Sequence, residues 1–205
     1  MTDSPSSLAA KHSAIGQLAG VHHTARPTWK LAETVRFYRD VMGLELCHAI
    51  TAKGWGPADH PDFIHFFFTA GQGSTIAFFY YLNTDRPPEA MAFDHWLYRS
   101  VHTAWRVETR DALLQWKARF EKHGVEVTQV PHEILESIYV TDPNGYMVEL
   151  TWQMREMQQE DSIDAALTLD AAITFEAQTN RRAQRIEEIW LAKGQHVDQY
   201  LRQDT

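Results

Sequence analysis

The chain has 205 residues, of which 44% are hydrophobic and 12% aromatic, so it can bury a sizeable core and is not disordered throughout. Its net charge of −8 argues against nucleic acid or an anionic membrane surface as the main partner. A single cysteine, Cys47, excludes an internal disulfide, and the sequence shows neither a secretory leader nor an apolar run of about 18 residues that could span a membrane. We therefore expect a cytoplasmic protein that acts on a small molecule.

The first half of the chain predicts a strand, a helix and three further strands. Residues 1–19 lack a sustained apolar period and are expected to form an N-terminal arm. Residues 20–82 show a β-like run, then apolar residues at helical spacing up to Gly43, then three more β-like runs. The expected elements are a strand at 21–26, a helix at 30–42, and strands at 44–51, 63–69 and 74–82.

The second half repeats this order after a linker at 83–100. Residues 101–152 are expected to form a strand at 101–107, a helix at 110–123, and strands at 125–130, 137–141 and 146–152. The repeat is visible in the residues, because His23-Thr24-Ala25 matches His102-Thr103-Ala104 and Gly43-Leu44-Glu45-Leu46 matches Gly124-Val125-Glu126-Val127. Two βαβββ modules predict an α+β fold in which a curved mixed sheet surrounds a metal cavity.

Residues 153–205 belong to neither module. Ile186, Ile189 and Trp190 fall at helical spacing, so we expect a C-terminal helical extension of one or two amphipathic helices. An apolar stripe on a short helix needs a partner surface. The extension is therefore expected to serve assembly or closure of the pocket rather than chemistry.

Two histidines and one glutamate are candidate metal ligands. His23 and His102 take the same place in the two first strands, and alternation puts His23 on the face opposite to His22. If an approximate two-fold axis relates the modules, the first strands lie close together, and Glu149 on the last strand joins the same cavity. Ala77 takes the position of Glu149 in the first module and cannot supply a fourth ligand. Two imidazoles and one carboxylate that leave open positions form the ligand set of non-haem Fe(II) oxygenases.

Four motifs stand out in the two modules. They are Gly-Val-His-His-Thr at 20–24, Phe-Tyr-Arg-Asp-Val-Met-Gly-Leu at 37–44, Ser-Val-His-Thr-Ala at 100–104 and Asp-Pro-Asn-Gly-Tyr-Met-Val-Glu-Leu at 142–150. Over residues 20–152 they resemble the vicinal oxygen chelate superfamily, which includes glyoxalase I, extradiol dioxygenases, fosfomycin-resistance thiol transferases and bleomycin-binding proteins. The second histidine of a first-strand pair is usually a ligand in this family, so the resemblance also implies His23, His102 and Glu149.

Departures from the branches of the family narrow the reaction. Glyoxalase I enzymes typically use four protein ligands, whereas Ala77 replaces one here, and the loop at 128–137 lacks the Lys or Arg that would hold a phosphonate. Bleomycin-type binding proteins lack the metal ligands. The resemblance therefore favours an extradiol dioxygenase with Fe(II), or with Mn(II) or another divalent metal. A metal-dependent isomerase, lyase or thiol transferase and a metal-free binding protein are the alternatives.

The resemblance to extradiol dioxygenases implies further site residues. Tyr139 stands ten residues before Glu149, as in those enzymes, and would hydrogen-bond a substrate oxygen. Either His132 or His95 would act as the acid/base group. The expected partners are a small aromatic substrate, O2 and a second copy of the chain in a homodimer. The substrate pocket is expected to use His65, Phe67, Phe78, Tyr80 and Trp96.

Overall fold

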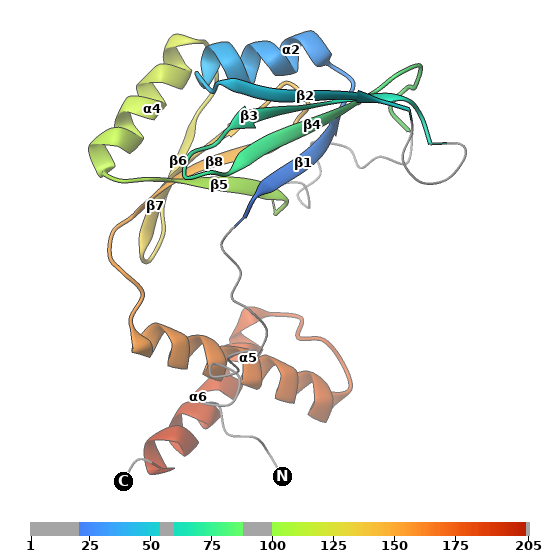
Figure 1. Cartoon of the computed structure of the whole chain (residues 1–205). Helices are drawn as coiled ribbons and strands as arrows, with labels where there is room; N and C mark the ends of the chain where they lie inside the picture. The colour runs from blue at the N-terminus through green and yellow to red at the C-terminus, as the bar shows by residue number, and fades with distance from the viewer. Residues whose placement is uncertain (1–20, 54–59, 88–99, 204–205) are drawn as a thin grey trace. The chain divides into compact units, whose positions relative to one another are not determined.

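The computed structural model describes residues 21–53, 60–87 and 100–203. Its first module forms a four-stranded mixed sheet in the order β1-β4-β3-β2, in which β1 is parallel to β4 and the other neighbours are antiparallel (Figure 1). Gly43, which was expected to end the helix, has a φ of +71°, a left-handed conformation that glycine adopts without strain. The elements are β1 (His23–Thr28), α2 (Leu31–Arg36), the π-helical turn η1 (Phe37–Val41), β2 (Leu46–Ala52), β3 (Phe63–Thr69) and β4 (Thr75–Tyr81).

The second module repeats this topology in a second sheet, in the order β5-β8-β7-β6. Its elements are β5 (His102–Val107), α4 (Arg110–Lys122), β6 (Thr128–Pro131), β7 (Leu135–Thr141) and β8 (Met147–Gln153). Thr109 caps α4 by accepting the Ala112 N–H at 3.1 Å, and Gly124 follows the helix with a φ of +72°. The α+β class and the two βαβββ modules are confirmed, but the described strands form two sheets instead of one curved sheet.

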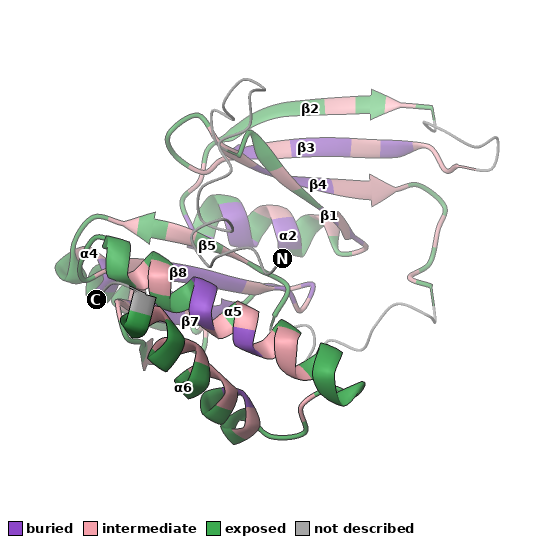
Figure 2. Cartoon of the chain, turned by 90° about the horizontal axis from the view of Figure 1, so that it is seen from below, coloured by how far each residue is buried: buried purple, intermediate pink, exposed green. Residues whose placement is uncertain are grey.

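The two sheets share one core on the faces that carry the helices. Phe78 of β4 and Val148 of β8 are fully buried there, and Phe37 of η1 stacks on Phe120 of α4 with 6.4 Å between ring centroids. Figure 2 shows the buried segments on α2, β3 and β8. Because side chains alternate along a strand, every second residue points to the opposite, open face of its sheet. The two open faces therefore lie on the sides of the sheets away from this core.

A buried polar joint fixes the β7–β8 turn against the first module. Thr28 donates to Asn144 Oδ1 at 2.6 Å, and Asn144 Nδ2 donates to Thr34 at 2.9 Å. Tyr38 donates its hydroxyl to Asp142 at 3.0 Å. Burial raises the pKa of Asp142 and that of Tyr38. These bonds satisfy polar groups inside the core and hold the two modules in one orientation.

The C-terminal extension forms a separate unit of two helices, α5 (Gln159–Thr179) and α6 (Ile186–Gln203). A capping box between Gln158 and Asp161 begins α5, and Lys193 of α6 bonds to Asp164 of α5 at 2.6 Å. The expected C-terminal helices are thus confirmed. Among the helices that the structure describes, none has the length and hydrophobicity needed to cross a membrane.

Candidate metal and substrate site

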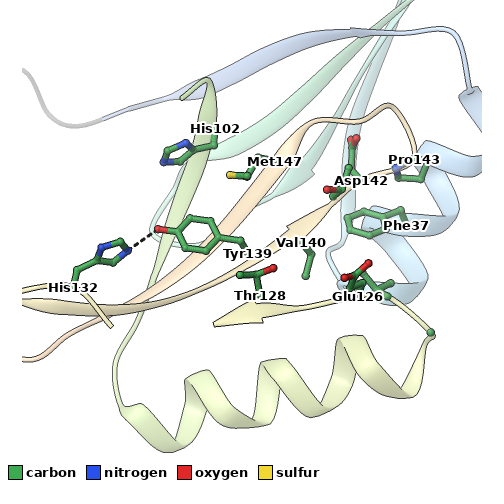
Figure 3. A pocket seen from close by; sticks show the side chains of 13 residues that line it. Phe37, His102, Glu126, Thr128, His132, Tyr139, Val140, Asp142, Pro143 and Met147 are labelled. Atoms are coloured by element: carbon green, nitrogen blue, oxygen red, sulfur yellow. Dashed lines mark hydrogen bonds between the residues drawn. The ribbon is translucent and has the colours of Figure 1, made fainter. Parts of the chain in front are cut away.

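The open face of the second sheet carries a continuous series of four interacting side chains. His102 Nε2 lies 2.8 Å from Glu149 Oε2, and Tyr139 donates its hydroxyl to Glu149 Oε1 at 3.0 Å. The Tyr139 oxygen also lies 2.9 Å from His132 Nε2 (Figure 3). The strands dictate this arrangement, since Tyr139 of β7 pairs directly with Glu149 of β8, and His102 begins the adjacent β5. Four of the predicted site residues therefore lie together.

The direction of these hydrogen bonds fixes where the protons sit. A carboxylate only accepts, so the single Tyr139 proton points to Glu149 and the Tyr139 oxygen accepts from His132 Nε2–H. His132 therefore keeps Nδ1 as an acceptor. Burial and the bond to Glu149 raise the pKa of Tyr139, so this phenol retains its proton at neutral pH. The Glu149 side chain is only 7% exposed and the His102 side chain 31% exposed.

A cavity of about 820 Å³ adjoins this series. Its lining includes His102, His132, Tyr139, Thr128 and Met147. Cavities of roughly 300–1,000 Å³ hold most small-molecule ligands. Imidazole, phenol, hydroxyl and thioether groups thus surround a space that accepts a small molecule.

The open face of the first sheet carries His23, His65 and Phe67. His65 is 4% exposed and its ring stacks on Phe79 at 3.7 Å between centroids, with an angle of 9° between the planes. Its Nδ1 lies 3.1 Å from the Phe78 carbonyl, which can only accept, so Nδ1 bears the proton and Nε2 is an acceptor. Burial lowers the pKa of His65. The ring centroids of His23 lie 6.4 Å from those of His65 and 6.0 Å from those of Phe67.

Several expectations for the pocket are corrected by the strand faces. Phe78 and Tyr80 pack in the core on the helix side of β4 and do not line the open face. Phe79 and Tyr81 take their place, because they alternate with Ala77 on the open side and stack on each other at an angle of 9°. The period of two along β4 could have identified both residues.

Other expected positions differ or fall outside the description. The expectation that His22 points away from His23 is wrong, because their Nδ1 atoms lie 2.9 Å apart. His22 precedes β1, where strand alternation does not yet apply. His95 and Trp96 lie outside the described residues.

The third candidate ligand does not meet the other two within one chain. Over the described ranges, no three His, Cys, Asp or Glu side chains are grouped so that they could hold a metal ion. Arg26 of β1 donates to Thr103 of β5 at 2.7 Å. By alternation, both of these residues lie on the core side of their strands, whereas His23 and His102 lie on the open sides. The sheets therefore meet through the faces that carry neither histidine.

Comparison with known proteins identifies the class of this fold and site. The family model described as the Glyoxalase/Bleomycin resistance protein/Dioxygenase superfamily matches residues 20–150. The chain belongs to this superfamily, which confirms the resemblance found in the sequence. No curated protein matches the chain.

Solved structures show the same fold at low sequence identity. A glyoxylase/bleomycin resistance protein/dioxygenase domain from Frankia sp. EAN1pec has a TM-score of 0.52 and 16% identity, over 69% of this chain and 96% of that one. A lactoylglutathione lyase from Agrobacterium tumefaciens has a TM-score of 0.48 and 21% identity, over 67% and 96%. The fosfomycin resistance protein FosX from Listeria monocytogenes has a TM-score of 0.48 and 18% identity, over 71% and 99%.

Proposed function

We propose that this chain is a metal-dependent extradiol-type dioxygenase, which uses O2 to cleave the ring of a catechol or a hydroquinone-like aromatic. The observation that carries the proposal is the series from His102 through Glu149 and Tyr139 to His132. It joins two metal-binding side chains to a phenol and an imidazole that can hold or pass a proton. It also borders a cavity that is large enough for a small aromatic molecule.

Fe(II) is the proposed metal, held by His23, His102 and Glu149, with Mn(II) or another divalent ion as the alternative. The 2.8 Å between His102 Nε2 and Glu149 Oε2 suits two neighbouring ligands, which lie about 3 Å apart when each is about 2.1 Å from one ion. Imidazole and carboxylate are also the expected donor types. When bound, such an ion would lower the pKa of a coordinated diol hydroxyl and offer an adjacent position for O2.

The side chains around this position have separate tasks. Tyr139 orients Glu149 through its hydroxyl. His132 donates Nε2–H to Tyr139 and keeps Nδ1 as a proton acceptor toward the cavity side. His65 offers Nε2 as an acceptor, and Phe67 and Phe79 provide flat apolar surface against an aromatic ring.

We propose further that two copies of the chain complete each site. The open faces lie on the sides of the sheets away from the shared core, so the His23 face of one copy can meet the His102 and Glu149 face of another. This arrangement brings the three ligands together without changing the core or the polar joint between the modules. A two-fold dimer would contain two such sites.

Metal analysis of anaerobically purified protein, followed by oxygen uptake with a panel of catechols and hydroquinones, tests the reaction. Bound Fe(II) with oxygen uptake supports the proposal. Bound metal without oxygen uptake on any diol overturns it in favour of a metal-dependent isomerase, lyase or thiol transferase. Protein that takes up no divalent metal points to a metal-free binding protein.

Mixing two inactive variants tests the shared site. His23→Ala and His102→Ala each remove one ligand from both sites of a homodimer. In a mixed dimer, one shared site loses both histidines and the other keeps all three ligands. The mixture should therefore recover metal binding and activity, up to about half in a pure mixed dimer. No recovery, despite subunit exchange shown by mass spectrometry, would place all three ligands in one chain.

A further inference from the structure

We propose that the α5–α6 hairpin binds the α5–α6 hairpin of a second copy, so that two chains form a four-helix bundle. This proposal concerns residues beyond the family match, which ends at residue 150. It does not depend on the proposed metal or reaction. It rests on the exposed apolar side chains of both helices, on their charges and on the register within the hairpin.

Each helix of the hairpin has an apolar stripe that the described chain leaves exposed. Leu169 and Ile173 lie one turn apart on α5, and Ile186 and Trp190 lie one turn apart on α6. Leu201 follows Trp190 by three turns on the same side. All five are more than half exposed, Trp190 at 63% (Figure 2). These stripes are distinct from the residues that pack inside the hairpin, such as Leu167, Ala171 and Ile189.

A second hairpin offers the area that these stripes need. Covering about 100 Å² on each of the five side chains in both copies would bury about 1,000 Å², the size at which a specific interface becomes plausible. Gly194 lies one turn after Trp190, and the space beside it is open. A helix can therefore approach α6 closely at this point.

The charges favour α6 of the second copy as the neighbour of α5. The helix α5 has five carboxylates and no Lys or Arg. Residues 181–203 have five Lys or Arg against three Asp or Glu, a net charge of +2. Residues 19–155 have 13 Lys or Arg against 16 Asp or Glu, a net charge of −3, and so do not complement α5. Two α5 helices would likewise repel each other.

A two-fold axis along the bundle satisfies these charges and sets the contacts. Each α5 then lies between two α6 helices and diagonally from the other α5. The pair Asp164–Lys193 fixes the level of α6 against α5, and an axis along the bundle keeps this level in the second copy. Within about a turn, Leu169 then meets Trp190 of the second copy, and Ile173 meets Ile186.

Substitutions at Trp190 and Gln195 test the interface in the full-length chain. Both residues are exposed on α6, but Gln195 lies off the stripe, so Trp190→Glu and Gln195→Glu add the same charge at different faces. We expect Trp190→Glu to weaken self-association by tenfold or more in sedimentation equilibrium, and Gln195→Glu to change it by less than twofold. Equal effects would overturn the proposal. So would a lower melting temperature of Trp190→Glu at unchanged mass, because the stripe would then cover the chain's own α/β body.

Disulfide trapping tests the predicted register independently. In a Cys47→Ser background, a chain with Leu169→Cys is co-expressed with a differently tagged chain with Trp190→Cys. We expect a covalent dimer that contains both tags, because the two positions face each other across the interface. Replacement of Trp190→Cys by Gln195→Cys should abolish it. Equal trapping at the two positions, or none at either, would contradict the bundle.

Discussion

Removal of one hydroxyl from Tyr139 should weaken metal binding without disturbing the fold. Tyr139→Phe keeps the ring on the open face of β7 but deletes the donor to Glu149 Oε1 at 3.0 Å. A hydrogen bond to a charged group contributes about 1.5–3 kcal/mol. Loss of a group that orients a metal ligand typically costs about 10- to 100-fold in metal affinity, which corresponds to about 1.4–2.8 kcal/mol. The two ranges agree, so we expect a 10- to 100-fold higher Kd.

The assay is an anaerobic titration of metal-free protein with Fe(II), repeated with Mn(II). Tyr80→Phe is the matched control, because it removes the same atom from a residue on the core side of the first sheet. Urea unfolding of the metal-free proteins separates an effect on the fold from an effect on the metal. A Kd of Tyr139→Phe within twofold of the original chain would refute the reasoning, since Glu149 would then need no orienting partner.

The corrected strand faces lead to two further predictions. Phe78→Ala should lower the free energy of unfolding by about 3–5 kcal/mol in urea titrations, because Phe78 is fully buried against Tyr38 and Phe66; Phe79→Ala, on the open face, should cost clearly less, and equal losses would contradict the assignment. Burial lowers the pKa of His65, so the folded chain takes up this proton less readily than the unfolded chain, and stability present at neutral pH is lost as the pH falls below about 6.5. His65→Gln should reduce that loss between about pH 8 and pH 5, and a variant with the same pH dependence would refute the role of His65.

The order of the elements could be predicted because it depends on short-range patterns. Two glycines, Gly43 and Gly124, end the helices with nearly equal positive φ values, and the strands follow the period of two. Periodicity alone does not reveal that the first helix changes to a π-helical turn over Phe37–Val41. That change depends on how Phe37, Tyr38 and Val41 fit into the core, which is a tertiary effect.

The side chains on the second-sheet face could be predicted for a related reason. Tyr139, Glu149 and His102 lie on paired strands of a single module, so local sequence order and strand register bring them together. The choice between Phe78 and Phe79 was also within reach, because Ala77 was placed on the site side and alternation then selects Phe79. The error came from judging the aromatic residues by type and not by parity.

The position of His23 relative to His102 could not be read from the repeat. A repeated module is compatible with a two-fold axis inside one chain and with one between chains, and both put the two histidines in equivalent positions. The choice depends on which sheet faces bury apolar area against each other, and on contacts such as that of Thr28 with Asn144, 116 residues away. In this chain the helix-bearing faces form the common core, which directs His23 and His102 to different outer surfaces. An internal repeat therefore predicts the ligand set, whereas the packing of the modules decides how many chains are needed to assemble it.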